Sequence, residues 1–406
     1  MGRGRALVGR LMPALLGAQL QICAAAPPAI LDPAAQGGSG DFAQALAPRA
    51  FDFPRDHGPH PEFRQEWWYL TGNLDATDGE RFGFELTFFR VALLPPPPAV
   101  AAAAAAAPAG PTSAWRTRQI YVAHFAVTDV ARRRFRFQQK LARDALGLAG
   151  AQPAPLHVWL DDWSLEVRQE EPAHPWTLHA AQPGYTIDLS LEPQSAPVRN
   201  GEAGLSRKSS QAGDATYYYS IPRLAVHGRL LRDGEPLELH GLAWLDREWG
   251  SGGLGPGEAG WDWFALQLED GSALMFYALR GQDGGREAHS AGTWIGADGA
   301  ARPLRNADVG ITVTGQWRNA SGEHYPAAWR IRVPALELDL AVHPALPEQE
   351  LRTTPPYWEG AVDVSGTRGG APLGGRGPLP FLRITDELDI AAATGAGPPV
   401  DSRCRP

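Results

Sequence analysis

The sequence predicts an all-β protein built from two β-barrel domains in tandem. Short apolar and aromatic runs, each closed by turn residues, follow one another from Phe51 onward. Helical periodicity is weak throughout, and its best example is the short stretch 138–148. Asp-Gly pairs, which favour the tight turns of β-hairpins, stand between several of the runs and begin at Asp78, Asp233, Asp270 and Asp298.

The expected strands carry many apolar–polar alternations, as half-buried strands do. The block 95–107 contains four prolines and seven consecutive alanines, too few to nucleate a stable helix, and is expected to be a disordered loop between two strands. In chain order, the expected strands cover residues 68–74, 82–94, 119–129, 157–167, 177–191, 217–231, 237–245, 263–268, 273–280, 311–317, 328–333, 336–342 and 358–366.

One hairpin pattern occurs twice in the chain. Residues 67–90 contain an aromatic-led strand, an Asp-Gly turn and an apolar strand ending in arginine, and residues 261–280 repeat this order. Chance similarity between hairpins is the alternative. The repetition favours a duplicated β domain in which each copy closes its sheet into a barrel and so removes exposed edges. The expected barrels cover residues 51–245 and 246–385.

The first 26 residues are predicted to be a signal peptide. Three arginines precede a short apolar stretch at 11–20, and alanines at 24–26 offer a cleavage site. A periplasmic or secreted protein is therefore expected, with lipidation at Cys23 as the less favoured alternative. Residues 27–50 are expected to form a linker, and residues 386–406 a polar tail.

Composition argues against several functional classes. The 406 residues fit about two domains. Acidic residues (45) outnumber basic residues (37), and the net charge of −8 disfavours a nucleic-acid partner. The sequence contains no GxxxxGK phosphate loop, no GxSxG nucleophile elbow and no glycine fingerprint after a strand, so no cofactor is expected. Fourteen tryptophans indicate large rigid aromatic surfaces in a core or a pocket.

Acidic and aromatic residues are concentrated in three segments of the chain. Strand alternation places Glu66 with Trp68 on one face, and Asp246 with Glu248 on another. Inside a barrel, carboxyls beside tryptophans have raised pKa values and serve as acids at neutral pH. The alternative is that they form structural ion pairs with nearby arginines. The segments lie at 53–69, 121–126 and 241–263, and the arginines are Arg55, Arg64 and Arg247.

These patterns nominate two groups of site residues. The pair His57 and His60 has the spacing of metal ligands, but it stands on a proline-bordered loop without further clustered ligands, so no metal site is predicted. The candidate catalytic residues are Asp262, Glu248, Asp246, His57 and Glu66. The candidate ligand-binding residues are Trp67, Trp68, Tyr69, His124, Trp249, Trp261, Trp263 and Tyr277.

The chain resembles the AttH-like family over roughly residues 50–377. The resemblance is carried by long runs: FPRDHGPHPEFRQEWWYLTGNL at 53–74, AHFAVTD at 123–129, LGLAG at 146–150, VWLDDWSLE at 158–166, YYYSIPRLAVHG at 217–228, GLAWLDREWGS at 241–251 and YWEGAVDVSGTRGGAPLGGRG at 357–377. After Gly377 the chain departs from the closing strand usual in the family, which leaves the last strand of the second barrel in question; a frameshift would produce such a tail.

The resemblance implies two lipocalin-like β-barrels in an exported protein. It also implies a relationship to carotenoid 1,2-hydratases, which add water across an isoprenoid carbon–carbon double bond with acidic and aromatic residues. Some members are called predicted secreted hydrolases. Other relatives stand beside ABC transporter permeases and have no settled reaction.

Two functions are therefore expected. The favoured one is a carrier or accessory factor that binds an apolar, lipid- or isoprenoid-like ligand for an inner-membrane ABC transporter permease. The alternative is a cofactor-free hydratase, or a secreted hydrolase, acting on that ligand. In the hydratase, a protonated Asp262 or Glu248 would donate a proton to the alkene, and a second carboxylate or His57 would direct the water. Aromatic faces would stabilise the cation, namely those of Trp68, Trp261 or Trp263.

The strand that begins at residue 261 limits the choice of acid. Side chains alternate along a strand, so Asp262 faces away from the surface that Trp261 and Trp263 share. If the tryptophans line the cavity, Glu248 is the better acid. A bulge in the chain would instead let all three residues converge on the ligand.

Overall fold

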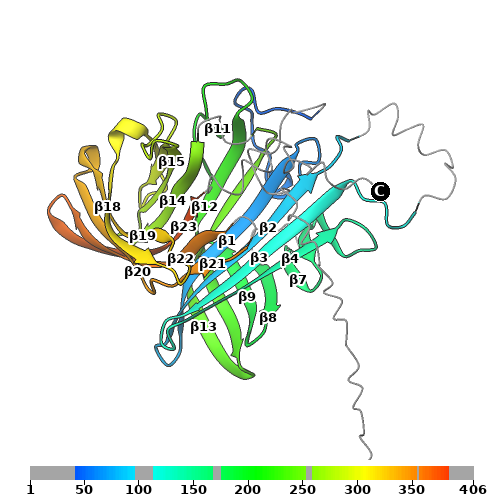
Figure 1. Cartoon of the computed structure of the whole chain (residues 1–406), viewed down its shortest axis with the longest axis horizontal. Helices are drawn as coiled ribbons and strands as arrows, with labels where there is room; N and C mark the ends of the chain where they lie inside the picture. Colours follow the sequence, from blue (N-terminus) through cyan, green and yellow to red (C-terminus); the bar gives the residue numbers. More distant parts are fainter. Residues whose placement is uncertain (1–41, 97–112, 168–174, 253–257, 354–355, 384–406) are drawn as a thin grey trace, which may run out of the picture.

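The computed structural model describes residues 42–96, 113–167, 175–252, 258–353 and 356–383. In these residues the protein is almost entirely β-structure, arranged in two sheets (Figure 1), so the all-β prediction is confirmed. The expected signal peptide, the polar tail and most of the expected linker and Pro/Ala-rich loop lie outside the described residues. Within the described ranges, no helix is both long and apolar enough to cross a lipid bilayer.

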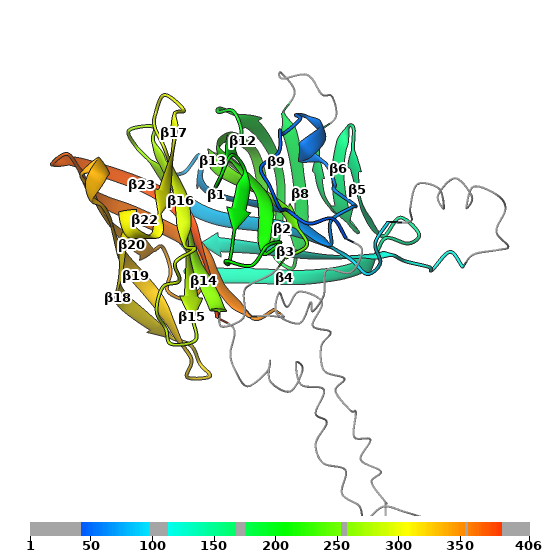
Figure 2. The same ribbon diagram turned by 90° about the horizontal axis from the view of Figure 1, so that it is seen from above.

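The first sheet curls into a nearly closed barrel (Figure 2). Its strands are β1 (Gln65–Ala76), β2 (Arg81–Ala92), β3 (Gln119–Asp129), β4 (Arg134–Arg143), β5 (Ala149–Pro153), β6 (Leu156–Leu160), β7 (Trp163–Glu166), β8 (Trp176–Gln182), β9 (Tyr185–Pro193), β10 (Val198–Arg199), β11 (Leu205–Arg207), β12 (Ala215–Arg232) and β13 (Glu235–Gly250). Hydrogen-bonded neighbours follow the order β4-β3-β2-β1-β13-β12-β9-β8-β7-β6-β5, and β10 and β11 also pair with β12.

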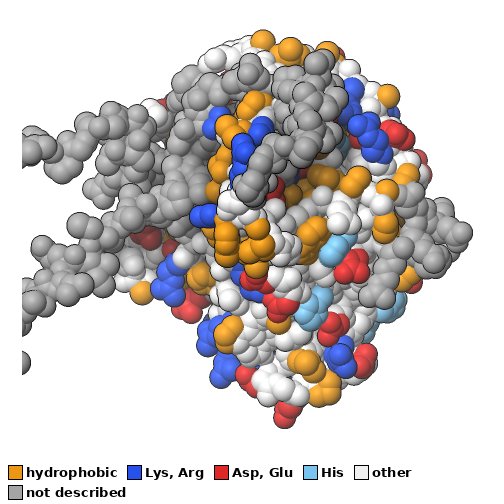
Figure 3. Space-filling model, turned by 90° about the vertical axis from the view of Figure 1, so that its right-hand side faces the viewer, with side chains coloured by type: hydrophobic (Ala, Val, Ile, Leu, Met, Phe, Trp, Pro, Cys, Tyr) orange, Lys and Arg blue, Asp and Glu red, His pale blue; other side chains and the backbone are white. Residues whose placement is uncertain are grey.

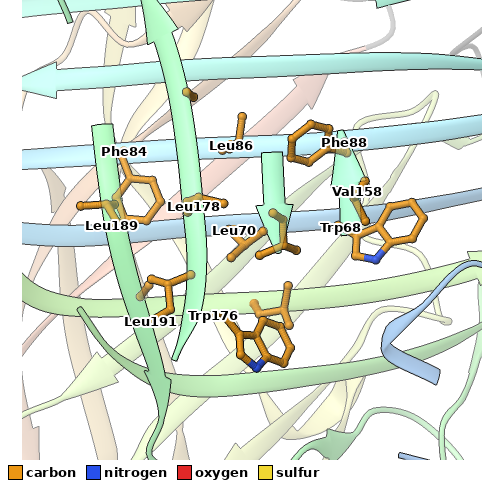
Figure 4. Packing of buried hydrophobic residues seen from close by; sticks show 14 of the residues in the cluster. Trp68, Leu70, Phe84, Leu86, Phe88, Val158, Trp176, Leu178, Leu189 and Leu191 are labelled. Atoms are coloured by element: carbon orange, nitrogen blue, oxygen red, sulfur yellow. The ribbon is translucent and has the colours of Figure 1, made fainter. Parts of the chain in front are cut away.

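The interior of this barrel is filled with apolar side chains. Trp68 and Leu70 of β1 point inward, and so do Phe84, Leu86 and Phe88 of β2 (Figure 4). None of these five side chains is more than 4% exposed. The barrel interior is therefore a packed hydrophobic core, and the residues that alternate with these five face outward.

The second sheet forms a half-barrel. Its strands are β14 (Glu258–Leu268), β15 (Ala273–Gly281), β16 (Ala291–Ile295), β17 (Ala301–Arg305), β18 (Gly310–Arg318), β19 (His324–Val333), β20 (Leu338–Pro344), β21 (Glu350–Leu351), β22 (Tyr357–Arg368) and β23 (Ala371–Arg383). Their order is β17-β16-β15-β14-β23-β22-β20-β19-β18, with β21 paired to β22. Short 3-10 helices occur at Arg55–His57, Asn306–Asp308 and Pro334–Leu336. One face of the sheet carries a second core around Trp329 and Trp358.

The structure changes one expected boundary and one expected element type. Strand β13 continues to Gly250, which pairs with Gln65 of β1, so the first sheet ends after residue 250 and not after residue 245. Residues 138–143 of the helical candidate 138–148 belong to β4 instead, because their backbone pairs with β3 in an antiparallel ladder. Long-range pairing overrides a weak local helical signal there.

The last strand forms despite the departure from the family pattern after Gly377. Strand β23 runs to Arg383 and pairs with β22 from Ala371 to Leu382. Its pairing with β14 is interrupted between Phe381 and Arg376. Pro378 and Pro380 lie in this gap and have no N–H to donate to a ladder.

The second sheet packs against the outward face of the first (Figures 1 and 2). A third apolar cluster lies between them, with Tyr218 and Trp244 from the first sheet and Trp263, Met275 and Tyr277 from the second. By contrast, the face of the first barrel in Figure 3 mixes apolar side chains with charged and histidine side chains. The cluster between the sheets is therefore apolar and rich in aromatic side chains.

Direct contacts lock the two sheets together. Arg81 of β2 pairs with Asp363 of β22 at 2.7 Å, and Arg376 of β23 pairs with Asp75 of β1 at 2.7 Å. The sheets also approach closely at Gly83, where an added Cβ would lie 2.7 Å from the Cβ of Ala361. A distance that short requires a shift, so Gly83 allows the close packing of β2 on β22.

A buried ionic cluster stands near one end of the first barrel, with Glu66 at its centre. Arg90 Nε donates to Glu66 Oε1, and Arg247 Nη2 donates to Oε2 at 2.7 Å. The His60 backbone N–H donates to both oxygens at 3.1 Å. Burial alone would raise the pKa of Glu66, but Arg90 and Arg247 hold it well below its usual range.

We expect Glu66→Gln to destabilise the protein by about 3–5 kcal/mol, because it leaves two buried arginines without their anion. The loss should be measured by urea unfolding of the full chain at neutral pH. The difference in unfolding free energy between the wild type and the variant should narrow as the pH falls through the acid range, because the wild-type carboxylate then takes up a proton. The control is Glu80→Gln at the half-buried pair with Arg232, expected to cost about 1 kcal/mol or less. Equal losses of unfolding free energy in the two variants would contradict the conclusion that Glu66 is the anion at the centre of the buried cluster.

Gly83→Ala should also lower stability, by about 1–3 kcal/mol, because its methyl group overpacks the contact with Ala361. Gly310→Ala on β18 is the matched control. An added Cβ at Gly310 meets nothing nearer than the Arg332 Cβ at 3.8 Å. Thermal unfolding of both variants measures the difference, and a Gly83→Ala protein as stable as the control would show that the sheets are not in tight contact at this point.

Candidate active site

A cavity of about 230 Å³ lies between the two sheets. Side chains from β1, β2, β3, β12 and β13 line one side, and side chains from β14, β15, β22 and β23 line the other. The cavity is therefore not inside a barrel, where the sequence analysis places the site, because apolar side chains fill that interior. Its aromatic lining consists of Trp67, Tyr69, Phe89, Tyr218, Trp261, Trp263, Tyr277 and Tyr357.

The cavity brings together most of the residues nominated from the sequence. Those at its wall are Trp67, Tyr69, His124, Trp261, Trp263 and Tyr277 among the ligand-binding candidates, and Glu66, Asp246 and Glu248 among the catalytic candidates. Those that do not line it are Trp68, Trp249, His57 and Asp262.

Asp246 of β13 is a buried carboxyl in the cavity wall. Its Oδ2 accepts a hydrogen bond from the Tyr218 hydroxyl at 2.9 Å, and Oδ1 accepts from the Ser220 hydroxyl and the Trp244 indole N–H. Burial raises the pKa of Asp246 to about 7, although the three donors act in the opposite direction. Both protonation states are therefore populated at neutral pH, which suits a group that takes up a proton from water or returns one.

Glu359 of β22 is a second buried carboxyl and belongs to the other sheet. The Tyr69 hydroxyl donates to its Oε1 at 2.6 Å, while Oε2 has no hydrogen-bond partner among the described residues. Burial raises the pKa of Glu359 above its usual range, against the smaller lowering effect of the Tyr69 hydrogen bond. Glu359 is therefore a neutral acid at pH 7.

His124 and Tyr357 form a neutral pair beside Glu359. His124 Nδ1 lies 2.7 Å from the Tyr357 oxygen, and Nε2 lies 2.8 Å from Nε2 of Gln139. Burial lowers the pKa of His124 to about 3, so the ring carries no charge at neutral pH. With the Gln139 amide donating to Nε2, the His124 Nδ1–H donates to the Tyr357 oxygen. The Tyr357 hydroxyl proton is then available to a ligand.

Glu248, a preferred acid of the sequence analysis, is paired with a lysine. Lys208 Nζ lies 2.8 Å from Glu248 Oε1 and 4.4 Å from the centre of the Tyr277 ring. Burial alone would lower the pKa of Lys208, but Glu248 and Tyr277 raise it above its usual value. Lys208 therefore remains an ammonium group whose charge Glu248 balances, and Glu248 is less suited than Glu359 to donate a proton.

Asp262 lies outside the cavity wall because β14 alternates as a regular strand at this point. Trp261 and Trp263 line the cavity, so Asp262 faces the other side of the second sheet. There, Arg280 Nε lies 3.2 Å from Asp262 Oδ1. Burial raises the pKa of Asp262 to about 6 and Arg280 lowers it. The predicted proton donation by Asp262 to a ligand between the tryptophans is therefore not compatible with its position.

His57, Trp68 and Trp249 belong to the first barrel and not to the cavity. His57 Nδ1 lies 2.6 Å from the Tyr219 hydroxyl oxygen, and burial lowers the pKa of His57 to about 4. The Trp68 indole N–H donates to the His57 carbonyl at 2.9 Å. Trp249 stacks on the His60 ring at 3.8 Å between ring centres. Their predicted roles with water and ligand are corrected. Alternation turns Trp68 and Trp249 toward the barrel core, and the 3-10 helix Arg55–His57 places the His57 ring against Tyr219 and Trp176.

Tyr357 and Glu359 are among the cavity residues that the sequence analysis does not nominate. They flank Trp358, whose side chain lies in the core of the second sheet. Alternation turns both neighbours to the opposite face, as it does for Trp67 and Tyr69 around Trp68 on β1. The repeated pattern of a core tryptophan between two polar or aromatic residues is the signal that could have found them.

Comparisons with known proteins place this architecture in a family. A family model described as AttH-like matches residues 44–377. The crystal structure of a Nitrosomonas europaea protein named for AttH is 34% identical in sequence, with a TM-score of 0.73, and the alignment covers 85% of this chain and 100% of that chain. Kievitone hydratase from Nectria haematococca has a similar fold, with a TM-score of 0.62, 16% identity, and 85% and 97% of the two chains covered.

One curated relative matches in sequence. It is the dehydratase asqC of Emericella nidulans, 24% identical over an alignment of 235 residues that covers 51% of this chain and 61% of the relative. The match thus spans less than two thirds of that protein. The long family match and the Nitrosomonas structure confirm the resemblance drawn from the sequence motifs. This chain belongs to the AttH-like family.

Proposed function

We propose that this protein is a hydratase or dehydratase that adds water to, or removes water from, a carbon–carbon double bond of an apolar small molecule held between its two sheets. The observation that carries the proposal is the presence of two buried carboxyls, Asp246 and Glu359, in the wall of one aromatic cavity. Burial raises the pKa of each, so that proton transfer at neutral pH is available from both.

The lining of the cavity supports an apolar, unsaturated ligand. Aromatic faces bury large apolar area, and they attract positive charge that develops on carbon when an alkene is protonated. Trp67, Trp261 and Trp263 supply such faces. Cation–π attraction is worth about 2 kcal/mol when the cation is desolvated.

The two carboxyls divide the reaction between them. In the direction of hydration, neutral Glu359 donates its proton to one alkene carbon, and a water oxygen bonds to the other. The Asp246 carboxylate takes the proton that the water loses. Both carboxyls then return to their starting states by proton exchange with solvent, and the net change is the addition of one water molecule. Dehydration follows the same steps in reverse.

Proteins similar to this chain support the choice of reaction. The curated relative is named a dehydratase, and a protein of similar fold is named a hydratase. These two names describe the two directions of one reaction type. They do not define a substrate for this chain, and the proposal names only the chemical class that the cavity suits.

A carrier function uses the same cavity without chemistry. The aromatic lining favours it, since a carrier of apolar ligands needs such a surface. A carrier, however, has no need for buried carboxyls with raised pKa values in its binding site, because each adds a desolvation cost. For this reason we favour the enzyme and treat binding without turnover as the competing outcome.

The proposal predicts that Glu359→Gln and Asp246→Asn each lower turnover by about 10²–10⁴-fold, the usual contribution of general acid–base catalysis. The assay offers lycopene-type polyenes, unsaturated fatty acids and phenolic enones in heavy-oxygen water and detects products by mass spectrometry. Ligand binding, followed by tryptophan fluorescence, should persist in both variants.

Asp262→Asn is the matched control for this experiment. It removes another buried carboxyl with a raised pKa, but one that faces away from the cavity. This variant should keep wild-type turnover. Saturable binding with no incorporation of heavy oxygen from any of the three compound classes would favour the carrier. Equal losses in Asp262→Asn and Glu359→Gln would rule out the cavity as the reaction site.

A further inference from the structure

A small second cavity of about 10 Å³ lies between the sheets beside Glu359. Glu85 of β2 and Glu359 of β22 both line it, together with Thr71 and Thr128. Glu85 is 2% exposed and so is Glu359. Two buried carboxyls, one from each sheet, thus border one small space between the sheets.

Each of these carboxyls has one hydrogen-bonded oxygen and one without a partner. The Thr87 hydroxyl donates to Glu85 Oε1, and the Tyr69 hydroxyl donates to Glu359 Oε1. Oε2 of Glu85 and Oε2 of Glu359 have no hydrogen-bond partner among the described residues. Buried polar atoms without partners are costly, so two of them beside one small space need a common explanation.

The charges around the pair are few. In the described part of the chain, no arginine or lysine forms an ion pair with either carboxyl. The titratable groups that face the pair are Tyr69 on β1, Tyr357 on β22 and the carboxyls themselves. Behind Tyr357 stands His124 of β3, which is neutral. With no cation to balance them, two ionised carboxyls are strongly disfavoured.

We propose that Glu85 is a neutral carboxylic acid that positions and stabilises Glu359: when Glu359 has given up its proton, Glu85 donates a hydrogen bond to the resulting carboxylate across the small cavity. The donation is direct or passes through one water molecule, for which the cavity has about the necessary volume. The loss of the proton from Glu359 during turnover is part of the proposed function, and the catalytic role of Glu85 rests on it. The pairing of the two carboxyls does not.

Two physical effects favour this arrangement. A hydrogen bond to an ionised acceptor is roughly twice as strong as one between neutral groups. Burial, together with the charge of a deprotonated Glu359, raises the pKa of Glu85, so Glu85 keeps its proton while Glu359 ionises. Glu85 is therefore a positioning residue, acting on the ligand only through Glu359.

Infrared titration of the carboxyl C=O bands of the full chain tests this pairing without any substrate. Glu85→Leu removes the donor, and the midpoint at which Glu359 loses its proton should move up by about one pH unit or more. Glu85→Gln keeps an acceptor for Thr87 and an N–H donor for Glu359, so its midpoint should stay near that of the wild type. An unchanged or lower midpoint in Glu85→Leu would overturn the proposal.

Glu359→Gln provides a second measurement that does not depend on the folding of Glu85→Leu. In this variant the C=O band of protonated Glu85 should persist across neutral pH. Its loss at or below neutral pH would show that Glu85 is an ordinary carboxylate and would also overturn the proposal. The C=O bands report the protonation of Glu85 and Glu359 whether or not water is added to any ligand. A negative result here is therefore distinct from a negative result in the hydratase assay.

Discussion

The candidate site depends on the exclusion of water from the surface where the second sheet covers the outward face of the first. Asp246 and Glu359 lie on strands whose outward faces would be solvated if either sheet stood alone. Packed together, the sheets leave them 4% and 2% exposed. Desolvation is the largest influence on the pKa of each, and it is what makes them usable as acid and base at neutral pH. Without that cover, the same carboxyls would be ordinary surface carboxylates.

In this molecule, neighbouring charge decides whether a buried glutamate is ionised or neutral. Glu66 and Glu359 are both buried, yet Arg90 and Arg247 keep the first ionised while the second, without a cation, stays neutral. Both line the cavity, but the ionised Glu66 is paired with two arginines, whereas the neutral Glu359 keeps its proton. Residues of one type thus serve structure in one place and chemistry in another, and the arginines make the difference.

Strand alternation let the sequence predict much of this site, because side-chain direction along a strand is a local property. It paired Asp246 with Glu248 and set Asp262 apart from its two tryptophan neighbours, as the structure has them. Alternation cannot show which of the two faces another sheet will cover. That is decided by packing between distant strands, which is why alternation alone does not predict a cavity between the two sheets.

A crystal structure with a bound conjugated polyene tests the central claim most directly. The two places named here for the ligand, beside Trp67, Trp263 and Glu359 between the sheets or beside Trp68 and Phe88 inside the first barrel, share no residues. The account predicts that the ligand lies between the sheets, against Trp67 and Trp263 and within reach of Glu359. A ligand bound inside the first barrel, among Trp68 and Phe88, would contradict it.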